Sequence, residues 1–212
     1  MKNSSATDIV SRVITVVLHP LLMPVYCTLL VLYAPTPYAD MPMSLNARIL
    51  GSVGLFACLI PLVFIGLFIA IGQISDIEMP THSERVHPLM LSSLAIGCSV
   101  FLVMGSVPRP VTGMLIGEAV ALFAASVCSI FWKVSLHAIG AGCLLSYVWV
   151  VGTSYHLDFT PVAVVAFIVA GVTAWTRLYE EAHTPAQIIT GYVMGAVIMF
   201  LILNQVMLRP IL

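Results

Sequence analysis

A short polar segment between two apolar runs places a histidine beside the start of a helix. Thr184, Pro185 and Gln187 match a helix start, with an N-cap, a proline in the first turn and a capping-box partner. His183 then lies at the mouth of that helix, where free N–H groups and the positive dipole end favour a phosphate. Arg177 adds a planar fork for phosphate oxygens. Because a histidine held against a bound phosphate can attack it, His183 is the candidate nucleophile.

A second polar segment supplies complementary groups. Lys133 and the hydroxyl of Ser135 can hold non-bridging phosphate oxygens. His137 can protonate a leaving alkoxide, because histidine titrates near neutral pH. Arg85, from a third polar segment, adds a cation for the charge that develops during the reaction. We expect no metal or other cofactor, since arginine, lysine and a helix dipole can do the electrostatic work.

The composition of the chain defines the elements that must position these residues. Of its 212 residues, 60% are hydrophobic and only 8% are charged, and the mean hydropathy is +1.09. A soluble domain carries roughly 25% charged residues, so this chain cannot form a water-exposed polar surface. The formal net charge is −1 and there is no run of like charges, which excludes nucleic acid as a partner. The composition predicts an all-α, polytopic membrane protein.

Seven apolar segments approach the length of a spanning helix, which is about 20 residues. They are 13–33, 49–71, 86–107, 111–131, 136–151, 161–175 and 186–207. No gap between them is long enough to fold separately, so we expect one integral-membrane domain, 1–212. The first segment contains Pro20 and Pro24 and is predicted to be kinked or re-entrant.

Ionisable residues gather on one side of this predicted bundle. The second, fourth and sixth connections between spans share a side. They hold four of the six histidines, which are His82, His87, His137 and His183. They also hold the charged residues Asp76, Glu78, Glu84, Arg85, Lys133, Arg177, Glu180 and Glu181. Anchoring by ordinary loop residues would explain one such connection. Three connections on one side, each with histidine beside arginine or lysine, indicate a site for an anionic group. The four histidines other than His137 and His183 are interpreted as structural or interfacial.

These residues resemble the motifs of the type-2 phosphatidic acid phosphatase superfamily, the integral-membrane lipid phosphate phosphatases. The third family motif is Ser-Arg, five residues, His, three residues and Asp. Arg177 and His183 have this spacing, with Thr176 in place of the serine. The second motif is Pro-Ser-Gly-His, to which Ser135 and His137 correspond.

The first family motif, a lysine followed after six residues by Arg-Pro, is represented more weakly. Arg85 lies three residues before Pro88, and Glu78 stands at the lysine position. The resemblance covers about 73–207 and implies a six-helix core preceded by one extra apolar segment. It implies metal-independent hydrolysis of a phosphorylated isoprenoid or glycerolipid. The implied roles are nucleophile for His183, acid for His137, and phosphate binding for Arg85, Lys133, Ser135 and Arg177.

Gln187 is the largest departure, because the family has an aspartate there that orients the nucleophile. Gln187 is either an adequate orienting group or only a capping residue, and Glu180 could replace the carboxylate. The alternatives are an inactive relative that binds or transports a lipid or anion, and a lipid phosphotransferase. Glu118, midway along the fourth predicted span, requires a partner or a polar cavity.

The charges also bear on which side of the membrane carries the site. The site side has Lys2, Arg12, Arg85, Lys133 and Arg177, and the opposite side has Arg48, Arg109 and Arg209. Counting all of them puts the site in the cytoplasm. Three of the first group are proposed phosphate binders, and leaving them out favours an extracytoplasmic site. The resemblance points the same way. We therefore expect a multi-pass protein of a bacterial inner or plasma membrane with an extracytoplasmic site.

Overall fold

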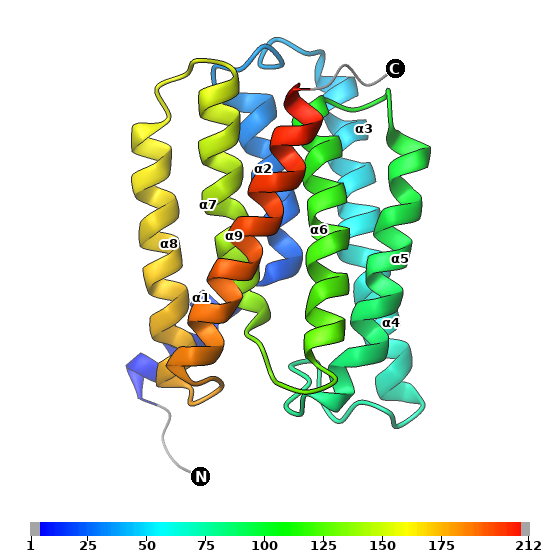
Figure 1. Cartoon of the computed structure of the whole chain (residues 1–212), viewed down its shortest axis with the longest axis vertical. Helices are drawn as coiled ribbons and strands as arrows, with labels where there is room; N and C mark the ends of the chain where they lie inside the picture. Colours follow the sequence, from blue (N-terminus) through cyan, green and yellow to red (C-terminus); the bar gives the residue numbers. More distant parts are fainter. Residues whose placement is uncertain (1–4, 209–212) are drawn as a thin grey trace.

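Long helices run side by side along one axis in the computed structural model, which describes residues 5–208 (Figure 1). In chain order they are α1 (Ala6–Val17), the short turn η1 (Pro20–Leu22), α2 (Met23–Tyr33), α3 (Met43–Val53), the π-helical segment η2 (Gly54–Leu59), α4 (Ile60–Ala70), the short turn η3 (Ser83–Arg85), α5 (Val86–Val103), α6 (Arg109–Cys128), α7 (Leu136–Ser154), α8 (Thr160–Tyr179) and α9 (Pro185–Leu208). Lys2 and Arg209, which entered the charge count, lie outside the described residues.

The predicted all-α bundle of about seven spans is confirmed. Among the described residues, six helices are long and apolar enough to cross a membrane: Met43–Ala70, Ser83–Val103, Arg109–Cys128, Leu136–Ser154, Thr160–Tyr179 and Pro185–Leu208. A seventh span would be the pair Ala6–Val17 and Pro20–Tyr33, which is bent by 41°. The fifth and sixth predicted segments extend beyond 136–151 and 161–175, because helix formation continues through their more polar ends.

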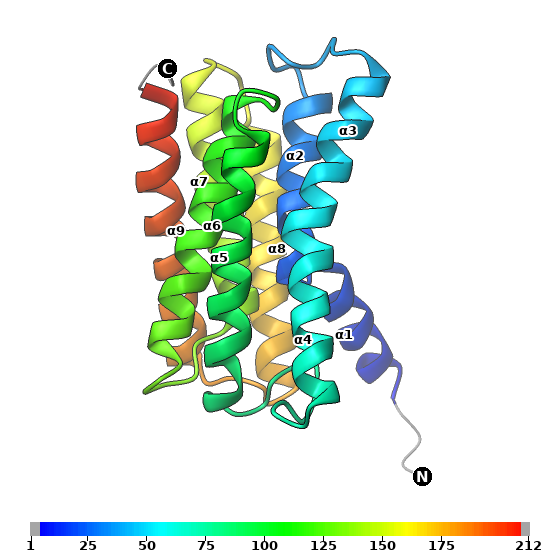
Figure 2. The same ribbon diagram turned by 90° about the vertical axis from the view of Figure 1, so that its right-hand side faces the viewer.

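The predicted kink in the first segment lies at Pro20, where α1 has ended and η1 begins. Proline lacks the N–H that would continue the helix ladder. His19 caps the new turn, because its Nδ1 accepts a hydrogen bond from the backbone N–H of Leu21 at 3.3 Å. Pro24 lies in the first turn of α2 and causes no second break. Figure 2 shows α1 diverging from the bundle axis at the end where the N-terminus lies.

α1 has an apolar face that points outward and a polar face that points toward the protein. Val13 and Val16 are exposed, whereas Ser11 and Thr15 are buried. This is the reverse of a helix on the surface of a soluble protein. It is the arrangement expected of a helix that lies at a membrane boundary and covers a polar site.

α7 and α9 approach each other closely because glycines line their contact. A Cβ added at Gly195 would lie 2.1 Å from the carbonyl oxygen of Ile139, and one added at Gly142 would lie 2.3 Å from that of Tyr192. Gly191 and Gly195 are one helical turn apart, as in the small-residue contacts of membrane helices. The contact fixes the start of α7 against the start of α9.

The three polar connections meet at one end of the bundle, which is the lower end in Figure 1. They are 71–82 between α4 and η3, 129–135 between α6 and α7, and 180–184 between α8 and α9. α1 lies at the same end. The topology therefore places the predicted phosphate-binding segments together.

Candidate functional site

A cavity of about 800 Å³ extends from the polar end of the bundle into its interior. Arg85, Lys133, His137, Arg177 and His183 all contribute to its lining. Most of the remaining wall is apolar, with side chains from α2, α4, α6, α7 and α9. The cavity thus joins a group of cations and histidines to a hydrocarbon-like interior.

His183 is held by Gln187 at the start of α9. Nδ1 of His183 lies 3.1 Å from Oε1 of Gln187, and the backbone N–H of Thr184 donates to that same oxygen at 3.1 Å. Because this atom accepts the backbone N–H, it is the amide oxygen, and Nδ1 must carry the ring proton. Nε2 of His183 is then unprotonated, which is the form that can act as a nucleophile.

Gln187 also completes the predicted capping box. Its backbone N–H lies 3.4 Å from the hydroxyl oxygen of Thr184, while its side-chain oxygen accepts from the Thr184 backbone. The sequence left open whether Gln187 orients His183 or caps the helix. In the structure the same amide oxygen of Gln187 contacts Nδ1 of His183 and caps the helix through the backbone N–H of Thr184.

The surroundings of His183 favour its neutral form. His183 is only 9% exposed to solvent. Burial, followed by the positive charges of Arg85 and Lys133, lowers the pKa of His183 to about 3. The same cations attract an anion, so the site combines an unprotonated histidine with a positive potential.

Arg85 joins two of the polar connections. It is 4% exposed, and its Nε and Nη1 donate to the carbonyl oxygens of Met79 and Val134 at 2.8 and 2.7 Å. Nη2 donates to the carbonyl oxygen of Glu78 at 3.2 Å. A guanidinium has five N–H groups, so three bonds to the backbone leave two for a ligand. These contacts fix the position of the Arg85 guanidinium.

Lys133 and Ser135 tie the 129–135 connection to the start of α9. Nζ of Lys133 donates to the carbonyl oxygen of Ala182 at 3.0 Å. The backbone N–H of Ser135 lies 3.4 Å from the carbonyl oxygen of Gln187, and its hydroxyl accepts from the N–H of Ala138 at 3.3 Å. Ser135 is fully buried as the N-cap of α7 and does not line the cavity. Its observed contacts hold the loop and do not face the cavity.

His137 lies in the first turn of α7, with its ring against α1 and η1. Its Nε2 is 3.3 Å from the carbonyl oxygen of Thr15, which requires a proton on Nε2. The ring meets that of His19 edge-on, with 5.3 Å between the centroids. His19 was interpreted from sequence as structural or interfacial, and it lines the cavity beside His137.

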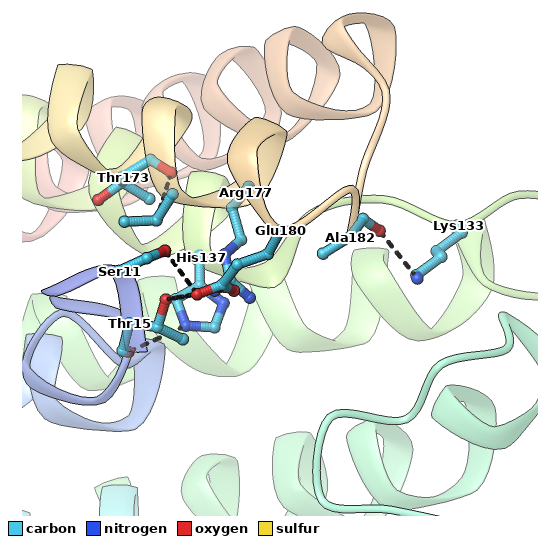
Figure 3. Close-up of polar contacts among 9 residues, drawn as sticks. Ser11, Thr15, Lys133, His137, Thr173, Arg177, Glu180 and Ala182 are labelled. Atoms are coloured by element: carbon cyan, nitrogen blue, oxygen red, sulfur yellow. Dashed lines mark hydrogen bonds and ion pairs between the residues drawn. The ribbon is translucent and has the colours of Figure 1, made fainter. Parts of the chain in front are cut away.

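Arg177 is held by a carboxylate and by α1 (Figure 3). The residue is 2% exposed, and its Nη2 donates to the carboxylate of Glu180 and to the hydroxyl of Thr15. Glu180 accepts further bonds from the hydroxyls of Ser11 at 2.7 Å and Thr15 at 3.1 Å. Within the described chain, Nε of Arg177 is buried without a hydrogen-bond partner. Arg177 therefore has a free buried donor beside its ion pair with Glu180.

The position of Glu180 does not agree with the hypothesis that it orients His183. Glu180 was considered as a substitute carboxylate for His183, but its two oxygens are used by Arg177 and by α1. The ion pair follows from the spacing of three residues along α8, which puts the two side chains on one face. The sequence around the motifs did not predict that Ser11 and Thr15 would bond Glu180 and Arg177.

No protein-family model matches the chain, and no curated protein or solved structure matches it either.

Proposed function

We propose that the protein is a membrane-embedded lipid phosphate phosphatase that hydrolyses a lipid phosphate or lipid diphosphate through a phosphohistidine on His183. The observation that carries this proposal is the hydrogen bond between His183 and Gln187. It leaves Nε2 unprotonated at the wall of a cationic cavity. The apolar interior of the same cavity suits the hydrocarbon part of a lipid.

The proposed first step forms a bond between Nε2 of His183 and phosphorus. The phosphorus–oxygen bond to the lipid breaks, and its electron pair leaves with the lipid oxygen. His137 enters this step as an imidazolium and gives that oxygen the proton on Nδ1, while its Nε2–H stays on the carbonyl oxygen of Thr15. Acid catalysis of this kind is typically worth 10²–10⁴-fold in rate. Arg85, Lys133 and Arg177 balance the negative charge on the remaining phosphate oxygens.

The second step releases phosphate. Water attacks phosphorus while His137, now neutral, takes a proton from it. The nitrogen–phosphorus bond breaks, and its electron pair returns to His183. Gln187 stabilises the imidazole through Nδ1 in both steps, because its oxygen accepts the N–H whether the ring is neutral or cationic.

The direct test is phosphate release from a lipid panel by purified protein in the presence of a chelator. The panel contains an isoprenoid diphosphate, phosphatidate, phosphatidylglycerol phosphate and a lipid A phosphate. We expect release by the parent chain, at least about a thousandfold less by His183→Ala, and unchanged release by His82→Ala. His82 is a matched control, because it bonds the carbonyl oxygen of Ser129 at 3.0 Å and lies outside the cavity lining.

Other outcomes separate the alternative functions. Equal release by His183→Ala would contradict the proposed nucleophile. Tight binding of a lipid phosphate without turnover would support a binding or transport protein. Transfer of the phosphate to an added alcohol would assign a phosphotransferase.

We also propose that the site faces away from the cytoplasm of a bacterial inner or plasma membrane. Thr81 is exposed in the 71–82 connection and is suited to labelling. A Thr81→Cys variant should react with a membrane-impermeant maleimide in intact cells, above the background of the parent chain. Reaction only after permeabilisation would place the site in the cytoplasm.

A further inference from the structure

Glu118 occupies the deep part of the cavity that His183 lines at its polar end. It lies ten residues before Cys128, where α6 ends beside the polar connections. At 1.5 Å per residue this places Glu118 about 15 Å from that end, near the middle of a spanning helix. A carboxyl group at this depth is unusual and marks a functional position.

The protein itself leaves this carboxyl group unpaired. Oε2 of Glu118 is buried and has no hydrogen-bond partner among the residues that the structure describes. Two neighbouring thiols in the cavity wall donate elsewhere, since Sγ of Cys58 bonds the carbonyl oxygen of Leu21 at 2.7 Å and Sγ of Cys143 bonds that of Gly195 at 3.4 Å.

A metal ion does not account for Glu118 either. Over residues 5–208, no three or more His, Cys, Asp and Glu side chains are grouped so that they could hold one. An unsatisfied buried polar group is unfavourable, so a ligand that supplies the missing hydrogen bond binds more tightly than one that does not. A carboxyl group accepts a hydrogen bond in either protonation state and donates one when protonated.

We propose that Glu118 is a specificity-determining residue that binds a hydroxyl group on the chain of the lipid phosphate. This inference rests on the proposed function, because it assumes that the phosphate binds at His183. It narrows the substrate class to lipids with a polar group about 15 Å from the phosphate, the distance that separates Glu118 from the polar end. A lipid with an unbroken hydrocarbon chain leaves the carboxyl group unpaired.

The test compares long-chain monoalkyl phosphates, one unsubstituted and a series with one hydroxyl at successive positions. We expect kcat/KM to peak at one hydroxyl position, about ten- to a hundredfold above the unsubstituted lipid. Glu118→Leu should abolish this preference, and Glu118→Gln, which still forms hydrogen bonds, should keep most of it. Leu122→Met, one turn along α6 in the same cavity wall, is the matched control and should retain the preference.

Three results would overturn the inference: no preferred position in the parent chain, a preference that survives Glu118→Leu, or an equal loss on all lipids in that variant. The thermal shift that each lipid causes is measured in parallel. If no lipid is hydrolysed but the hydroxylated ones stabilise the parent chain more than Glu118→Leu, the proposed function fails and the role of Glu118 stands. If lipids are hydrolysed equally well with and without the hydroxyl group, the proposed function stands and the role of Glu118 fails.

Discussion

The side-chain oxygen of Gln187 lies 3.1 Å from Nδ1 of His183 and accepts the backbone N–H of Thr184 at the same time. One neutral amide thus fixes the tautomer of the histidine and the start of α9. The two tasks can be separated by substitution, because only one of them depends on Thr184.

Gln187→Leu should remove both tasks. We expect phosphate release to fall by at least about tenfold, since the imidazole loses the group that holds its tautomer. The thermal midpoint should also fall, by the equivalent of about 1 kcal/mol for a lost cap. Gln187→Asp should raise the rate, because a carboxylate stabilises the imidazolium better than an amide does.

Thr184→Ala is the matched control for this pair. It removes the hydroxyl that accepts the N–H of Gln187, while the bond from His183 stays in place. Stability should fall with little change in rate. A rate loss as large as that of Gln187→Leu would mean that capping alone explains Gln187.

The lowered pKa of His183 predicts a pH-dependent stability. The folded value of about 3 lies below the ordinary 6.5, so between these values the unfolded chain binds the proton more strongly. Stability linked to His183 is therefore complete above pH 6.5 and is lost as the pH falls toward 3. Thermal unfolding of the parent chain and His183→Asn checks this. The parent should lose stability faster on acidification, and parallel curves would contradict the lowered pKa.

The ion pair between Arg177 and Glu180 should compete with phosphate. In Glu180→Gln the amide oxygen can still accept from Ser11 and Thr15, but the negative charge is gone. We expect a KM for lipid phosphate about threefold to tenfold lower, because the charge of Arg177 becomes available to the ligand. Glu181→Gln changes an exposed neighbouring carboxylate and should have a smaller effect. A raised KM in Glu180→Gln would show that Glu180 orients Arg177 for binding.

Close contact between α7 and α9 should be necessary for activity. A Cβ at Gly195 would meet the backbone oxygen of Ile139 at 2.1 Å, which side-chain movement cannot relieve. Gly195→Ala should cost about 1–3 kcal/mol and reduce phosphate release, because α7 carries His137 and α9 begins two residues after His183. Gly171→Ala, with open space around it, should leave both unchanged. Equal thermal midpoints for the two variants would show that the contact is not tight.

The spans were predictable from sequence because each depends on a local run of apolar residues. The helix start at Thr184 was also predictable, since a capping box spans only four residues. The cluster around Arg177 was not, because Ser11 and Thr15 bond Glu180 across sequence separations of 169 and 165 residues. The polar face of α1 becomes meaningful only once the chain has folded over the site.

The contacts of Arg85 illustrate the same limit. A cation near the phosphate was expected, but its bonds to the carbonyl oxygens of Met79 and Val134 depend on irregular connections that carry no periodic signal. The sequence likewise predicted Ser135 at the phosphate. The structure shows it as a buried cap of α7, and whether it contacts phosphate stays a prediction.

The most direct measurement of the central claim is to trap the covalent intermediate. Purified protein is mixed with a lipid phosphate that carries radiolabelled phosphate, quenched in alkali and digested, and the label is located. We predict an alkali-stable, acid-labile phosphate on the peptide that contains His183, which is absent from His183→Ala. Turnover of the lipid with no label on His183, or label retained in His183→Ala, would contradict the account.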